Sequence, residues 1–138
     1  MMNSKVTKNT EQGDVPWSLD DFERNKPKAF NPDEISSFLN YLDRERDKAE
    51  VKFDSYKDQV NEQFDYVVLE KLDKNKVSIA QAKAQATQDK RYLDVKEEYR
   101  KVKLNHLYWK SLAKNGWSHC DNLKQLAIND IAISKLTK

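Results

Sequence analysis

Residues that form turns are nearly absent from most of this 138-residue chain. It contains two glycines and three prolines, and all three prolines lie between residues 16 and 32. Charged residues make up 35% of the chain and apolar residues 38%, a mixture typical of long helices and coiled coils. Because a compact globule needs more turns than these, the composition predicts an all-α protein of extended helices with a thin apolar contact surface.

The first long helix is predicted from residue 31 to about residue 72. Asn31 supplies an N-cap side chain, Pro32 suits the first helical position, and two acids follow at the positive end of the helix dipole. Two interleaved series then repeat every seven residues, and eight of their ten members are apolar. The series are Leu39, Arg46, Phe53, Val60 and Val67, and Ile35, Leu42, Ala49, Tyr56 and Gln63. This pattern predicts a coiled-coil contact surface, called here the seam.

A second long helix is predicted after a break at residues 73–76. Ser78 and Gln81 form a capping box at its expected start. Asn115-Gly116 is its weak point, because glycine has a low helix propensity. The helix either continues to about Ala127, or it ends at Asn115-Gly116 and Ser118 caps another helix. Residues 128–138 are expected to form a short helical extension. The predicted seam of this helix consists of Tyr92, Val95, Tyr99, Val102, His106, Trp109, Ala113, Cys120, Leu123 and Ala127.

Residues 1–30 are expected to form a separate, flexible segment ahead of a helical domain at residues 31–138. Residues 1–15 are polar and without periodicity, which predicts disorder. Trp17, Leu19 and Phe22 follow in an acidic context. They form either a motif that docks on a partner or a cluster that packs back onto the long helices.

Charge is distributed unevenly along the chain. Residues 1–77 hold 13 Lys or Arg and 17 Asp or Glu, a net of −4, whereas residues 78–138 hold 12 and 6, a net of +6. Such asymmetry indicates self-association or a polyanionic partner for the basic half. The N-terminus does not resemble a signal peptide and no apolar run is long enough for a membrane span, so we expect a cytoplasmic protein without membrane contact.

The residue types needed for catalysis are poorly placed. The only glycines, Gly13 and Gly116, form no phosphate-binding loop. His106 and His119 have no supporting carboxylate, and His106 and Cys120 are better explained as seam residues. The acids alternate with Lys and Arg at helical spacing, as on a solvated face. We therefore expect a protein that is not an enzyme, with no cofactor and no metal site.

The basic half carries a stripe of cations and aromatics. Lys96, Lys103, Lys110 and Lys124 are separated by multiples of seven, and Trp117 fills the remaining step. Lysines along a rod can neutralise phosphates, and exposed aromatic rings can stack on bases. The alternative is that the stripe pairs with first-helix acids such as Asp43, Glu50 or Glu62. The candidate nucleic-acid-binding residues are Lys96, Arg100, Lys101, Lys103, Tyr108, Lys110, Lys114 and Trp117.

Residues Ala82–Ala127 resemble the carboxy-terminal helical region of UvsY-type recombination mediators of tailed phages. Tyr108-Trp109, Leu112, Asp121 and Leu123-Lys124 carry the similarity. The resemblance implies a small helical oligomer that binds single-stranded DNA and contacts the phage recombinase and the single-strand-binding protein. It implies that the protein helps the recombinase displace the single-strand-binding protein, without catalysis.

Two functions are thus expected from the sequence. The first is a phage-type recombination mediator that binds single-stranded DNA as a homo-oligomer and helps load a recombinase. The second is a coiled-coil interaction module, such as a structural adaptor or a phage inhibitor of a host complex, in which the basic stripe serves folding or grips an acidic protein.

Overall fold

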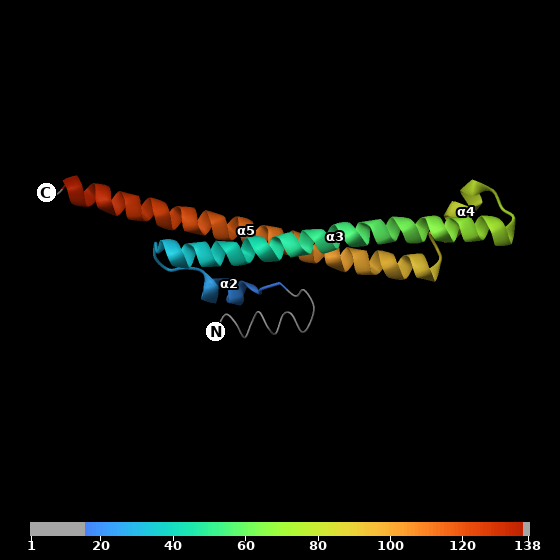
Figure 1. Cartoon of the computed structure of the whole chain (residues 1–138), viewed down its shortest axis with the longest axis horizontal. Helices are drawn as coiled ribbons and strands as arrows, with labels where there is room; N and C mark the ends of the chain where they lie inside the picture. Colours follow the sequence, from blue (N-terminus) through green and yellow to red (C-terminus); the bar gives the residue numbers. More distant parts are fainter. Residues whose placement is uncertain (1–15, 137–138) are drawn as a thin grey trace. The chain divides into compact units, whose positions relative to one another are not determined.

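The computed structural model describes residues 16–136, and all regular structure within that range is α-helical. The helices of this described range are α2 (Leu19–Asn25), α3 (Pro32–Asn75), α4 (Ile79–Ala86) and α5 (Lys90–Leu136) (Figure 1). This confirms the predicted all-α class with two long helices. Within the described range, no helix has an apolar stretch sufficient to cross a bilayer.

The chain divides into two compact units, and both long helices contribute to each. Among the described residues, unit 1 contains residues 16–48 and 107–136, and unit 2 contains Ala49–His106. In each unit a part of α3 packs along a part of α5 in the opposite direction. The two long helices therefore pair within one chain.

The N-terminus of α3 forms as the sequence predicts. The Asn31 side-chain oxygen accepts hydrogen bonds from the backbone N–H groups of Asp33, at 3.1 Å, and Glu34, at 3.2 Å. These bonds satisfy two donors that the first helical turn leaves open. Pro32 follows as the first helical residue because it has no N–H to satisfy.

The two predicted seams face each other and form the core of each unit. In unit 1, Leu39 and Leu42 of α3 are buried, as are Trp109 and Ala113 of α5. In unit 2, the Phe53 ring stacks on Tyr99 and on His106, with centroids 5.5 and 5.1 Å apart. All twenty predicted seam positions are buried or half-buried, which confirms the seven-residue pattern in both helices.

Gly116 lies inside α5 and does not end it. A Cβ at this position would collide with Leu42 Cδ1 and lie 3.2 Å from Phe38 Cε2. The glycine therefore permits close approach of α3 and α5 in unit 1, and the helix continues because this packing outweighs the low helix propensity of glycine. The alternative of a helix end at Asn115-Gly116 is wrong.

The start of the second long helix differs from the prediction. Ser78 and Gln81 do form a capping box, with bonds of 3.1 and 3.2 Å, but the helix they open is the short α4. The chain turns at residues 87–89, and Asp89 then accepts a hydrogen bond from the Arg91 N–H at 2.9 Å as α5 begins. Helix α4 packs two buried alanines, Ala82 and Ala86, into a core cluster of unit 2 with Val67 and Val68 of α3.

Residues 16–30 belong to unit 1 and contact its long helices. The Trp17 side chain is fully buried, stacks on Tyr41 at 4.8 Å and lies 6.2 Å from the Trp109 ring. Phe22, on α2, packs at 5.8 Å from Phe38. Trp17 and Phe22 thus pack back onto α3 in this structure, whereas Leu19 is 72% exposed. The predicted disorder of residues 1–15 lies outside the described residues.

Candidate nucleic-acid interface

The predicted nucleic-acid-binding residues are all exposed on α5, but they divide between the two units. Lys96, Arg100, Lys101 and Lys103 belong to unit 2, whereas Tyr108, Lys110, Lys114 and Trp117 belong to unit 1.

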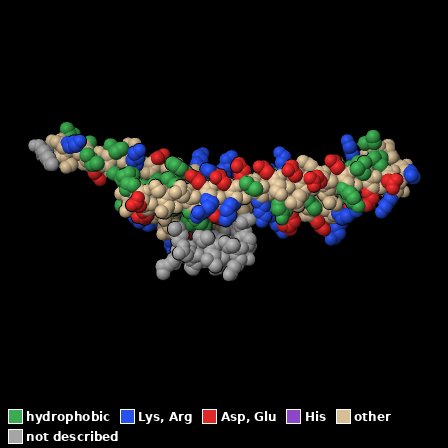
Figure 2. Space-filling view, viewed as in Figure 1, with side chains coloured by type: hydrophobic (Ala, Val, Ile, Leu, Met, Phe, Trp, Pro, Cys, Tyr) green, Lys and Arg blue, Asp and Glu red, His purple; other side chains and the backbone are tan. Residues whose placement is uncertain are grey.

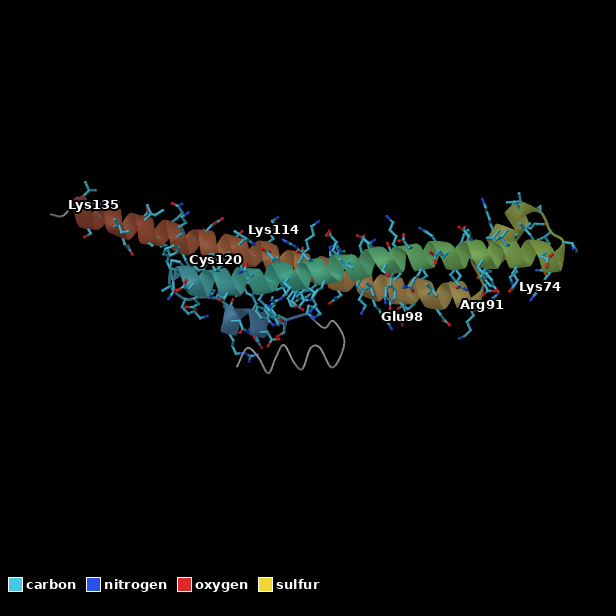
Figure 3. The ribbon with its side chains drawn as sticks, in the orientation of Figure 1. Lys74, Arg91, Glu98, Lys114, Cys120 and Lys135 are labelled. Atoms are coloured by element: carbon cyan, nitrogen blue, oxygen red, sulfur yellow. The ribbon has the colours of Figure 1, made fainter. Side chains whose placement is uncertain are left out.

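In unit 2, two of the four predicted cations have acidic partners one helical turn away. Arg100 binds Glu97 through two hydrogen bonds of 2.6 and 3.0 Å, and Lys101 lies 3.5 Å from the carboxylate of Glu98, which Figure 3 labels. The bonds with Arg100 lower the pKa of Glu97, and those with Glu97 raise the pKa of Arg100. The cluster is thus more neutral than its lysine and arginine content indicates.

The other two cations of unit 2 are less engaged with acids. The Lys96 ammonium lies 5.7 Å from the centroid of the Tyr92 ring, which is a cation–π contact. Among residues 49–106, neither Lys96 nor Lys103 forms an ion pair with Glu50 or Glu62. Arg91 of α5 instead pairs with Glu70 of α3, and Lys71 of α3 pairs with Asp89, the residue before α5.

In unit 1, Trp117 connects α5 to α3. Its indole N–H donates a hydrogen bond of 3.0 Å to Asp43 Oδ1, and Arg46 Nη1 lies 3.3 Å from the same oxygen. The Trp117 side chain is 46% exposed, while the other two tryptophans, Trp17 and Trp109, are buried. The indole is therefore held in one place while part of its surface faces solvent.

Lys110 and Lys114 precede Trp117 by seven and three residues, which places all three on one side of α5. Neither lysine forms an ion pair with any residue between 16 and 136. Asp43, one of the α3 acids that could have paired with the basic stripe, binds Trp117 and Arg46 instead. Figure 3 labels Lys114 on α5. Uncompensated cations beside an exposed ring are the components of a site for single-stranded nucleic acid.

Tyr108 does not belong to this group. Nine residues, or about two and a half helical turns, separate it from Trp117, so the two rings lie on opposite sides of α5. Tyr108 and Trp117 cannot form one stacking surface for a strand that runs along the helix. The unit 1 surface is therefore Lys110, Lys114 and Trp117, called here the Trp117 surface, with Asp43 and Arg46 as its support.

The sequence did not assign Asp43 and Arg46 to the interface. The sequence pattern places Arg46 in the seam and Asp43 on a solvated face or as an acid that pairs with the basic stripe. The available signal was that a polar residue interrupts an otherwise apolar series at Arg46. The contact between Asp43 and Trp117 joins residues 74 positions apart, and it depends on the register of two helices.

The other side chains that could take part in chemistry have structural roles in the described part of the chain. Cys120 is a buried seam residue, and burial raises the pKa of its thiol, which disfavours the reactive thiolate. Burial also raises the pKa of Tyr41 to about 12. The His119 Nε2 atom lies 2.6 Å from the Pro27 carbonyl oxygen, so this side chain attaches the segment after α2 to α5. No cluster of three or more metal-binding side chains occurs within residues 16–136.

The geometry thus offers a binding surface built on Trp117, and the resemblance to UvsY-type mediators remains a prediction from the residues that carry it. Comparisons with known protein families, with characterised proteins and with solved structures find no match.

Proposed function

We propose that this protein binds single-stranded DNA without sequence preference, and that the Trp117 surface is the centre of the binding site. An exposed indole can stack on any base because every base has a π-face. Lys110 and Lys114 on the same side of α5 are placed to neutralise phosphates of the same strand. No compact element for reading a DNA groove is present among the described helices.

The observation that carries the proposal is the fixed, half-exposed position of the Trp117 indole. A side chain that is already ordered loses little conformational freedom when a ligand binds to it. The bond to Asp43 supplies this order, and Arg46 balances the negative charge of Asp43, so the support does not repel phosphates. Burial would instead be expected for a tryptophan whose role is limited to packing, as seen for Trp17 and Trp109.

The unit 2 cations have a secondary role in this proposal. Lys96 and Lys103 have no carboxylate partner in the described part of unit 2. Arg100 and Lys101 have such partners on the surface, and surface ion pairs contribute little because solvent and salt screen them. Arg100 and Lys101 can therefore release Glu97 and Glu98 and bind a phosphate at little cost in free energy. In this way the unit 2 cations add non-specific electrostatic affinity for DNA.

The wider role that fits this binding is that of a recombination mediator. The resemblance to UvsY-type proteins supports a homo-oligomer that acts in the cytoplasm of a host cell, without cofactor or catalysis, and helps a recombinase replace the single-strand-binding protein. The second candidate, a coiled-coil interaction module, is favoured by one observation: Figure 2 shows acidic and basic side chains interspersed on the visible face, with no broad basic surface.

Fluorescence anisotropy with a labelled oligo(dT) at two salt concentrations tests the proposal. We expect binding that weakens with salt, and a slope of log affinity against log salt that falls by roughly 0.7 for each phosphate contact removed, as in Lys110→Ala or Lys114→Ala. Lys57→Ala, an exposed lysine on α3 in unit 2, is the matched control and leaves the slope unchanged. Absence of binding at low salt would exclude the DNA-binding function and leave the interaction module.

A further inference from the structure

The end of α5 in unit 1 is rich in apolar side chains and packs against no other helix of the described residues. The helix extends past the start of α3 (Figure 1), and every residue from Ile128 to Leu136 is exposed. Ile128 lies on one side of this segment, and Leu126 and Ile133 lie on roughly the opposite side. Exposed apolar side chains on more than one side of a helix favour contact with a partner, and the described chain does not cover them.

One ridge of the segment has a charge order that suits a second copy of itself. Asp121, Ile128 and Lys135 are spaced by seven residues and therefore lie on one side of α5. All three are exposed, and neither Asp121 nor Lys135 forms an ion pair with any residue between 16 and 136. Figure 3 shows Lys135 on the part of α5 that extends past α3.

The order acid, apolar, base becomes complementary when a second copy runs in the opposite direction. With Ile128 level with Ile128 of the second copy, Asp121 of each chain faces Lys135 of the other. A parallel arrangement would instead place Asp121 against Asp121 and Lys135 against Lys135. The segment is also neutral overall, because Asp121 and Asp130 balance Lys124 and Lys135, so two copies do not repel each other.

We infer that residues 121–136 of α5 form a self-association surface, on which a second copy of the same segment packs antiparallel about a two-fold axis at Ile128. Such an interface is isologous: the same residues serve both copies, and the contact closes on itself. It buries Ile128 and Ile131, which are 46% and 57% exposed in the single chain.

This inference rests on the proposed function only for the expectation that the protein self-associates, and it leaves the Trp117 surface accessible. With the axis at Ile128, Leu136 of the second copy comes level with Cys120. Trp117 lies beyond that point on the same helix and stays outside the contact. DNA binding and self-association are therefore separable by mutation.

Charge reversal with sedimentation equilibrium, in the absence of DNA, tests the inference. The unaltered chain is expected to sediment as two copies or an even multiple. Asp121→Lys alone and Lys135→Asp alone each place like charges opposite one another and weaken association about ten-fold. A mixture of these two variants restores it, because the lysine introduced in one variant then faces the aspartate introduced in the other. These positions are exposed, so folding is not at risk.

Ile128→Asp, at the two-fold axis, is expected to give a monomer. Leu69→Asp is the matched control, since this exposed leucine lies on α3 in unit 2 and its change should leave association intact. A wild-type monomer at 100 µM, or two weakened variants that fail to recover when mixed, would overturn the antiparallel pairing. Binding of a short oligonucleotide to the Ile128→Asp monomer would show that DNA binding at the Trp117 surface does not depend on self-association through residues 121–136.

Discussion

Gly116 of α5 lies so close to Leu42 of α3 that a Cβ on the glycine would collide with the Leu42 Cδ1 methyl group. Leu42 is fully buried and Phe38 lies on the other side of the contact, so neither side chain has free space to move into. The short distance between the helices at this point also brings Trp117 within reach of Asp43, which holds the indole on the surface. The core of unit 1 and the candidate interface thus depend on the same glycine.

Gly116→Ala is predicted to destabilise the protein. Overpacking against Leu42 costs about 1–3 kcal/mol, while alanine recovers about 1 kcal/mol in helix propensity, so the net change is a loss of up to about 2 kcal/mol. Chemical denaturation measures the change in the free energy of unfolding. Asn115→Ala, at the exposed neighbouring position, is the control and should be neutral or slightly stabilising. A more stable Gly116→Ala variant would show that the helices separate easily here.

Trp17→Ala is predicted to destabilise unit 1 by about 3–5 kcal/mol, as for a large buried aromatic residue. The ring is fully buried against Tyr41, Phe38 and Trp109. Leu19→Ala, two residues away and exposed, should change stability by less than about 0.5 kcal/mol. Thermal and denaturant unfolding of both variants compares them directly. Equal stability of Trp17→Ala and the unaltered chain would instead make Trp17 available for docking on a partner.

Arg91 is predicted to make the stability of unit 2 depend on pH. It binds Glu70 at 2.6 Å and Asp89 at 3.0 Å, and these bonds lower the pKa of both carboxyls. Lys71, 3.2 Å from Asp89, acts in the same direction. Because the pKa values are lower in the folded chain than in the unfolded one, the stabilisation is complete above about pH 5 and is lost progressively as the pH falls below about 4 toward the lower folded-state pKa values of the two carboxyls.

Melting temperatures of Arg91→Gln and the unaltered chain between pH 7 and pH 2 check this prediction. The difference between them should be largest near neutral pH and should shrink in acid, where the carboxyls are protonated. Lys90→Gln is the control, because its ion pair with Asp94 is highly exposed and should contribute little. A difference that is constant across the whole pH range would mean that Arg91 stabilises unit 2 through packing alone.

Much of the fold was predictable from seven-residue spacing, because burial of one helix face is a local property of the sequence. The places where prediction failed depend on contacts between distant residues. The turn at residues 87–89 contains neither Gly nor Pro, and it forms because Ala82 and Ala86 of α4 find a core with Val67 and Val68. The sequence indicates a helix break at Gly116, because the close contact with Leu42 that requires a glycine is a contact between residues distant in sequence.

The candidate site was predictable in part. The neutralisation of Arg100 and Lys101 follows from Glu97 and Glu98 three residues earlier, a spacing that the sequence shows directly. The opposite placement of Tyr108 and Trp117 follows from helical geometry as well. The support of Trp117 by Asp43 does not, since the hydrogen bond requires the relative register of α3 and α5 in unit 1.

Quenching of tryptophan fluorescence by oligo(dT) tests the stacking role of Trp117 most directly. Trp17 and Trp109 are buried, so a change in emission when DNA is added reports on Trp117. We predict quenching that saturates together with the anisotropy signal. In Trp117→Ala the quenching should disappear and binding should weaken by about 1–3 kcal/mol, with an unchanged salt slope. Binding of oligo(dT) without quenching, or equal quenching and affinity in Trp117→Ala, would contradict the assignment of Trp117 as the stacking residue.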